Sequence, residues 1–256
     1  MHHPCINLEL LFVLLFPKTD MRETLASLDL SDNLGITCVT LGAIICAPML
    51  QRLNMESTNL YGMFRSIDRP NALRSIVELN MSDCSLSCAD FRMLIDVLGN
   101  PDNPIRSLKK LDVSRNRIGT PFINYLLHSR NTRLSFANLE VLDMSCCRCA
   151  HCEFDFKKHE SFESIRQQSA LVSLKSLYLG KTNLDAAEIM RFVTNCTPSI
   201  NVVDINFTRL MNFASKTQEC CLYTDIVPFT RPIGLKELGK INFIIYHNFT
   251  LPAFVF

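Results

Sequence analysis

The sequence has almost no excess charge of either sign, since its 256 residues include 26 Lys and Arg against 25 Asp and Glu. Proteins that bind nucleic acid or anionic membranes carry clustered positive charge, so we predict no nucleic-acid partner. The apolar stretch Leu8–Phe16 is too short for a transmembrane segment, which takes about 20 residues. Because it contains Glu9 and lacks a basic segment before it, we predict a helix there, with a signal peptide and secretion as the alternative.

Motifs of common enzymes are missing as well. The eight glycines form no G-x-G-x-x-G sequence and no phosphate-binding loop. H-E-x-x-H and G-x-S-x-G, which are typical of zinc proteases and serine hydrolases, do not occur. We therefore predict that the chain is not an enzyme, with no catalytic residues and no cofactor.

The twelve cysteines are too dilute and too irregularly spaced for a disulfide scaffold. Several fall at positions predicted below to face a core, where Cys acts as a small hydrophobe, and this favours a reducing compartment such as the cytoplasm. Cys149-x-x-Cys152 has a spacing that zinc accepts. Because the repeat explains Cys147 and Cys149 and no second pair follows, we predict no metal site, with Cys149 and Cys152 as the weak candidate ligands.

One template, L-x-x-L-x-L-x-x-N-x-L, can be laid on the chain seven times. The copies begin at residues 25, 50, 76, 108, 139, 174 and 200, and their three leading positions are always aliphatic or Met. We call the asparagine position the ladder position; it is always Asn, Thr or Cys, namely Asn33, Thr58, Cys84, Asn116, Cys147, Thr182 and Thr208. A side chain that turns inward there must satisfy buried backbone groups.

The spacing of the copies, from 25 residues between the first two to 35 between the fifth and sixth, leaves room for a helix after each strand. The pattern of 89–98 places Phe91, Leu94, Ile95 and Leu98 on one helical face. Further helices are predicted over 121–127, with Thr120 as the N-cap and Pro121 at the first helical position, and over 186–193, after the cap Asp185.

These units predict an α/β leucine-rich-repeat (LRR) solenoid, a horseshoe with parallel strands on its concave face and helices on its convex face. Residues 1–24 read as a partial preceding repeat or N-terminal cap, 25–210 as an array of about seven repeats, and 211–256 as an atypical tail or cap. The last segment loses the template and ends in an apolar run. We interpret it as either an unusual cap or a sequence that is not the natural continuation of the array, and favour the second.

Two surfaces are candidates for binding a partner protein. One is the column of residues between the second and third leading positions, which should face solvent: Asp29, Asn54, Asn80, Asp112, Asp143, Tyr178 and Asp204. These acids and the tyrosine suit a basic segment, although a merely solvated face is the alternative. The other is the long insert 150–168, with Phe154, Phe156, Lys157 and Lys158, because irregular insertions often carry recognition; an ordinary surface loop is its alternative.

The amino-acid sequences of Leu28–Gly35 and Leu111–Gly119 resemble repeats of the ribonuclease-inhibitor-like class of LRRs. Within that class, the uneven repeat lengths and residues 139–195, with Ser161-Phe162 after a basic insert, are most similar to the capping-protein, Arp2/3 and myosin-I linkers (CARMIL proteins). The resemblance implies a cytoplasmic regulator of actin assembly, at the cytoskeleton or cell cortex, that acts by binding proteins. Nothing here matches that family's capping-protein-binding segment. An innate-immune or inhibitor-type LRR recognition protein is the alternative.

Overall fold

The computed structural model describes residues 21–66, 73–98, 105–119, 136–147, 171–182, 199–204 and 242–244. Their strands form one parallel eight-stranded sheet in which the spatial order is the order of the sequence. The strands are β1 Ser27–Asp29, β2 Arg52–Asn54, β3 Glu78–Asn80, β4 Lys110–Asp112, β5 Val141–Asp143, β6 Ser176–Tyr178, β7 Val202–Asp204 and β8 Asn242–Ile244. An unclosed stack with one strand per repeat confirms the LRR solenoid.

The register of the sheet places equivalent template positions side by side. Leu28 pairs with Leu53, Leu53 with Leu79, and so on along the array to Val203. These central residues are buried in β2 to β7 while their two neighbours are exposed or half-buried. Each strand therefore turns its middle side chain inward and the two flanking side chains outward.

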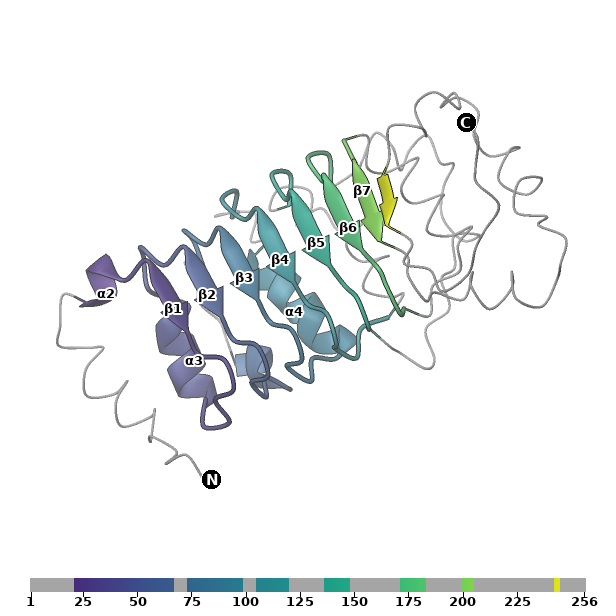
Figure 1. Ribbon diagram of the computed structural model, residues 1–256. Helices are drawn as coiled ribbons and strands as arrows, with labels where there is room; N and C mark the ends of the chain where they lie inside the picture. The colour runs from purple at the N-terminus through teal and green to yellow at the C-terminus, as the bar shows by residue number, and fades with distance from the viewer. Residues whose placement is uncertain are drawn as a thin grey trace, which may run out of the picture.

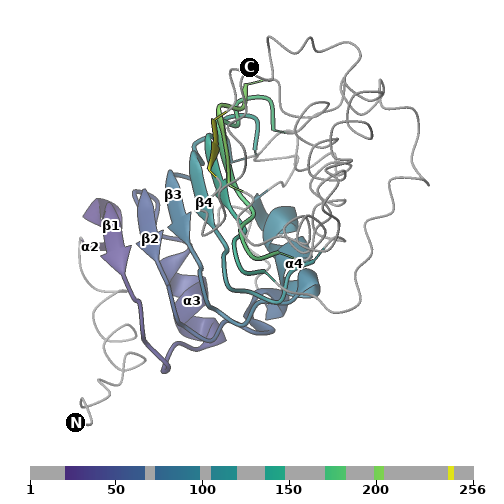
Figure 2. The same ribbon diagram turned by 45° about the vertical axis from the view of Figure 1, so that its right-hand side comes forward.

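Helices pack on the inward face of the sheet. α2 (Met21–Thr24) precedes β1, α3 (Cys38–Ile44) follows it, and α4 (Cys88–Leu98) follows β3. Figures 1 and 2 show α3 and α4 on the same face of the row of strands. The opposite face, which we call the concave face, is left open by the elements that the structure describes. This is the arrangement predicted for the two faces of the solenoid.

α4 confirms the predicted helix and begins one residue earlier, at Cys88. Ser87 and Asp90 exchange bonds across its first turn: the Asp90 backbone N–H donates to Ser87 Oγ at 3.3 Å, and Asp90 Oδ2 accepts the Ser87 backbone N–H at 3.0 Å. Asp90 Oδ1 also accepts the backbone N–H of Gly62 from the preceding repeat, at 3.0 Å. This fully buried carboxylate thus caps its own helix and ties it to the neighbouring unit.

The second repeat differs from the prediction of an α-helix in every unit. It contains the 3-10 helix η1 (Met63–Ser66). Gly62, directly before it, has φ +72 and offers its N–H to Asp90 of the next repeat. Repeat length does not explain this difference, because the first repeat is one residue shorter, at 25 residues, and contains the α-helix α3.

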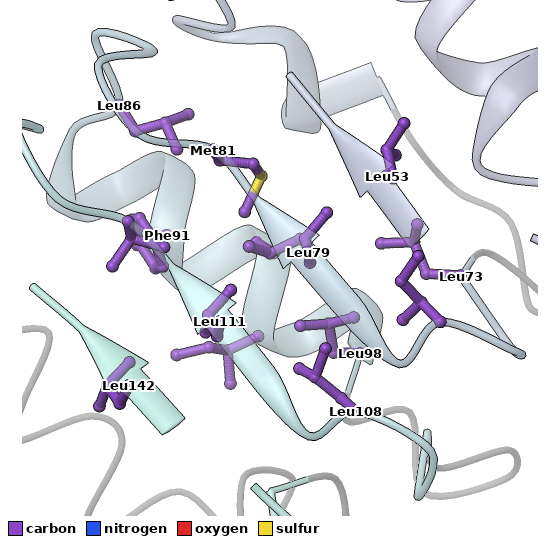
Figure 3. Close-up of a cluster of buried hydrophobic side chains, with 14 of the residues drawn as sticks. Leu53, Leu73, Leu79, Met81, Leu86, Phe91, Leu98, Leu108, Leu111 and Leu142 are labelled. Atoms are coloured by element: carbon purple, nitrogen blue, oxygen red, sulfur yellow. The ribbon is translucent and has the colours of Figure 1, made fainter. Parts of the chain in front are cut away.

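The core is a continuous apolar layer between strands and helices. The predicted inward residues Phe91, Leu94, Ile95 and Leu98 of α4 are all fully buried. Figure 3 shows Phe91 and Leu98 beside Leu79 of β3 and Leu111 of β4. Each unit therefore covers the apolar side chains of its neighbours, and no repeat has a closed core of its own.

The ladder position links each repeat to the one before it. In four successive repeats its side chain donates a hydrogen bond to the carbonyl of the preceding repeat's third leading residue. The pairs are Thr58 to Leu30 at 3.1 Å, Cys84 to Met55 at 2.9 Å, Asn116 to Met81 at 2.7 Å and Cys147 to Val113 at 3.2 Å. Asn116 Oδ1 also accepts the backbone N–H groups of Cys84 and Leu86, at 3.0 and 2.9 Å. The predicted role of the position, satisfying buried backbone groups, is confirmed.

The residue before the ladder position takes the left-handed conformation in six repeats, with φ between 56 and 59° at Asp32, Ser57, Asp83, Arg115, Cys146 and Lys181. None of them is glycine. In five of the six, the backbone N–H still donates to a carbonyl of the next repeat, as in Asp83 to Ser114 at 3.0 Å. The cost of about 1 kcal/mol or more at each such residue is therefore offset by bonds between repeats.

Several predicted elements lie outside the described residues: the N-terminal helix over 8–16 and the helices over 121–127 and 186–193. Within the predicted tail 211–256, the three residues of β8 are described, and they pair in parallel with β7. The division of the chain into cap, array and tail stays a prediction. Figure 1 shows β8 in yellow beside β7.

We expect Asn116→Ala to lower the free energy of unfolding by about 3 kcal/mol or more, because it leaves the buried N–H groups of Cys84 and Leu86 and the Met81 carbonyl without partners. Urea unfolding followed by circular dichroism measures the loss. Asn33→Ala is the matched control, since Asn33 donates only within its own turn, to Leu30 and Ser31. Equal losses in the two variants would contradict the role of the ladder between repeats.

Candidate partner-binding surface

The predicted column of solvent-facing residues is continuous in the structure. Neighbouring strands pair Asp29 with Asn54, Asn80 with Asp112, and Asp143 with Tyr178, so that the seven side chains stand in one row from β1 to β7. Asp29 is exposed and the other six are half-buried. The row lies at the carboxyl ends of the strands, on the concave face.

Five members of the column share a structural task that the sequence pattern did not reveal to us. A side-chain oxygen of each accepts the backbone N–H two residues later, at distances from 2.8 to 3.1 Å; the five are Asp29, Asn54, Asn80, Asp112 and Asp143. Such a bond closes an Asx turn, which directs the chain out of the strand and into the loop. The signal available in the sequence was the recurrence of Asp or Asn at this one position.

The two halves of the column differ in charge. Asn54 and Asn80 are neutral, whereas Tyr178 lies between Asp143 and Asp204, and Asp112 is the next neighbour of Asp143. Neighbouring strands lie about 4.8 Å apart, so Asp112 and Asp143 are close neighbours. We call these four residues, Asp112, Asp143, Tyr178 and Asp204, the acidic cluster.

Burial raises the pKa of Asp143, and the charges of Asp112 and Asp204 raise it further, against the opposing bond from Ser145. Asp29 stands at the other end of the row, and there the bonds from Ser31 hold the pKa of the carboxyl below its ordinary value. The charge on Asp143 is therefore disfavoured by the fold, whereas the charge on Asp29 is favoured.

The neighbouring column is formed by the first residue of each strand, and near its middle a positive and a negative side chain form an ion pair. Lys110 Nζ lies 2.9 Å from Glu78 Oε1 on the adjacent strand. On the loops beyond the carboxyl ends of the strands, Arg115 pairs with Glu56 at 2.7 Å. Exposed pairs of this kind contribute about 0–1 kcal/mol each, so they shape the charge of the surface more than they stabilise it.

A second repeated position was also missed. Three residues before a strand, a polar side chain donates to a backbone carbonyl of the preceding repeat: Ser107 to Arg74 at 3.2 Å, Asn138 to Arg106 at 2.8 Å and Ser199 to Val172 at 2.7 Å. Ser75 donates in the same way to Pro48. The recurrence of Ser or Asn directly before the first leucine of the template was the signal in the sequence.

The other predicted candidates lie outside the described residues. These are the insert residues Phe154, Phe156, Lys157 and Lys158, and the weak zinc candidates Cys149 and Cys152. In the ranges that the structure describes, no group of three or more His, Cys, Asp or Glu side chains could hold a metal ion. In those same ranges, no helix is both long and apolar enough to span a membrane.

The buried thiols Cys84 and Cys147 fill ladder positions and form no nucleophilic site. Burial raises the pKa of each to about 12. Each also points its Sγ at a backbone carbonyl, of Met55 and of Val113 respectively. They behave as small core residues that donate a hydrogen bond.

No protein-family model matches the chain, and no curated protein matches its sequence. Among solved structures, an internalin from Listeria monocytogenes is similar over 80% of this chain, at 14% identity and a TM-score of 0.40. A structure of the Rad7–Elc1 complex of yeast is similar over 72%, at 17% identity and a TM-score of 0.31. The chain spans 57% of the length of each of the two matched chains. The LRR fold itself is identified from the strand register and the ladder bonds described above.

We expect Asp143→Asn to raise the free energy of unfolding at neutral pH, because the amide keeps the bond from Ser145 and removes a disfavoured charge. The folded-state pKa of Asp143 lies above its unfolded value, so its contribution lowers stability as pH rises through the interval between the two. Asp29→Asn should lower the free energy of unfolding at neutral pH, since the lowered pKa of Asp29 contributes stability that is lost as pH falls. Thermal unfolding of both variants between about pH 4 and 7 tests this, and a destabilised Asp143→Asn would contradict it.

We expect iodoacetamide at about pH 8 to alkylate the exposed Cys38 in the folded protein and to leave Cys84 and Cys147 unmodified. The thiolate is the reactive form, and at a pKa of about 12 only roughly one such thiol in 10,000 is ionised at that pH. Peptide mapping by mass spectrometry locates the modified residues. Unfolding in urea should equalise the three, and rapid labelling of Cys84 or Cys147 without urea would contradict the assignment.

Proposed function

We propose that this chain is a non-catalytic scaffold that binds a basic segment of a partner protein at the acidic cluster on the concave face. The observation that carries the proposal is the strand register, which places Asp112, Asp143, Tyr178 and Asp204 in one row on the concave face. The Asx turn at this position needs only a side-chain oxygen, and Asn54 and Asn80 supply that oxygen without a charge. The structural task therefore explains the oxygen of Asp143 and leaves its charge to be explained by binding.

A lysine or arginine side chain from a partner would offset the electrostatic repulsion between Asp143 and its neighbours Asp112 and Asp204. Three carboxylates that repel one another attract a cation more strongly than isolated ones do, because their potentials add. Tyr178, between Asp143 and Asp204 in the register, offers a half-buried aromatic side chain to the same cation or to its aliphatic stem. Tyrosine and arginine are both enriched in protein interfaces.

The resemblance to CARMIL proteins leads us to propose, more narrowly, that the scaffold acts in the regulation of actin assembly in the cytoplasm, near the cell cortex. This narrower proposal is supported by the amino-acid sequence of the repeats and by their uneven length. Neither structural neighbour bears on this narrower role. A tagged chain should colocalise with cortical actin in cells, and a diffuse or secreted chain would overturn the narrower proposal while leaving the binding of a basic segment intact.

Binding at the acidic cluster is tested with a fluorescent peptide rich in Lys and Arg, titrated with the purified chain and followed by anisotropy. We expect the triple variant Asp112→Asn, Asp143→Asn, Asp204→Asn to bind about tenfold or more weakly, since each of the three charges contributes up to about 1 kcal/mol. Added salt should weaken binding to the unsubstituted chain by screening these charges.

Asp29→Asn is the matched control, because Asp29 occupies the same template position but pairs in register with the neutral Asn54. Its affinity for the basic peptide should stay within about twofold of the unsubstituted chain. A peptide of the same length with serine in place of the basic residues should not bind. Equal effects of the triple and control variants would overturn the assignment to the acidic cluster.

A further inference from the structure

A hollow of about 400 Å³ lies at the amino ends of β4 to β7, at the edge of the sheet opposite to the acidic cluster. Apart from Arg106, the lining residues occupy two repeated positions. One position lies three residues before a strand begins, and the other lies directly before the strand. The lining residues are Arg106, Ser107, Lys109, Asn138, Glu140, Ser173, Lys175 and Ser199. Every one of them is polar or charged, so the hollow is not a gap in apolar packing.

The charge of this hollow is positive. Three cationic side chains, Arg106, Lys109 and Lys175, face one carboxylate, that of Glu140. Glu140 lies between the two lysines, 2.7 Å from Lys175 Nζ and 3.5 Å from Lys109 Nζ. The bond from Lys175, followed by the charges of both lysines, holds the pKa of Glu140 below its ordinary value.

Arg106 is the cation of the lining that has no ion-pair partner in the described ranges. Among the described residues no carboxylate lies within ion-pair distance of its guanidinium, while its backbone carbonyl is occupied by Asn138. Lys109 is only loosely paired, and its ammonium group has three donors for one carboxylate contact. The hollow therefore contains more hydrogen-bond donors of positive charge than its own carboxylate can satisfy.

Three polar side chains of the lining are held in place by the bonds that Ser107, Asn138 and Ser199 donate to the preceding repeat. Ser173 occupies the same template position and adds a further hydroxyl to the lining. Polar side chains fixed in this way beside three cations suit an oxyanion. Carboxylates and phosphates are bound in this way in proteins.

We propose that this hollow binds an oxyanion, a carboxylate or a phosphate group, carried on an acidic segment of a protein. The site goes beyond the binding of a basic segment at the acidic cluster and stands on its own residues. About four residues, or roughly 13 Å, separate the two sites along a strand. A partner with a basic and an acidic stretch would meet charges of opposite sign at the two edges and be held in one orientation.

The test uses two fluorescent peptides, one rich in glutamate and one with phosphoserine, titrated with the full chain and followed by anisotropy. The double variant Arg106→Gln, Lys109→Gln should bind the recognised peptide about tenfold or more weakly. Glu140→Gln should bind it more tightly, because it removes the carboxylate that competes with the ligand for Lys109 and Lys175. A merely structural role for Glu140 would not strengthen binding.

Lys110→Gln is the matched control, since Lys110 follows Lys109 in the chain but pairs with Glu78 outside the hollow. It should leave the affinity within about twofold of the unsubstituted chain. Binding of either peptide with this pattern supports the site, and the stronger of the two identifies the oxyanion. Inorganic phosphate is added as a competitor. If it displaces the peptides at equal concentration, the natural ligand is free phosphate, and the proposal that an acidic protein segment binds there is wrong.

Three results would overturn the proposal: no binding of either peptide at millimolar concentration, weaker binding to Glu140→Gln, or equal losses in Lys110→Gln and the double variant. Circular dichroism of each variant verifies that it is folded, as expected for substitutions of exposed or half-buried side chains. Loss of the basic-peptide site alone would leave the hollow unaffected, because the two tests use ligands of opposite charge and different residues.

Discussion

One hydrogen bond recurs in four successive repeats and the rest of the structure depends on it: a ladder side chain donates to the carbonyl of the residue that directly follows the preceding strand. Thr58, Cys84, Asn116 and Cys147 all make this bond. It satisfies carbonyls that would otherwise be buried without partners as the chain leaves the sheet. Once these bonds set the distance between repeats, the strands pair in register and the apolar layers of neighbouring units meet.

The same constraint produces the two candidate surfaces. Because every strand is three residues long and in register, the last residues of the strands form one row and the residues that directly precede the strands form another. The first row closes an Asx turn after five of the strands, and in its second half it gathers the charges of Asp112, Asp143 and Asp204. The second row leads into the strands and gathers Arg106, Lys109 and Lys175 beside Glu140. Charges of opposite sign are thereby separated along the strands of a chain with almost no net charge.

The parts of the fold that could be predicted are those that depend on periodicity. The strand centres, the ladder position, the concave column and the inward face of α4 all follow from the spacing of apolar residues. The 3-10 helix η1 was not predicted, because repeat length does not distinguish it from an α-helix: the first repeat is one residue shorter and contains α3. The hollow was not predicted either, since its lining residues are up to 93 positions apart, from Arg106 to Ser199, and only the stacking of four repeats brings them together.

The sequence by itself determined the repeat, the strand register and the residues that face outward, because a strict template permits only one way to stack. The tertiary structure decided what those residues do. Asp143 and Asp29 occupy the same template position, yet the neighbours across the sheet raise the pKa of one and the local turn lowers that of the other. Electrostatic energy depends on distances between side chains from different repeats, and those distances exist only once the solenoid has formed.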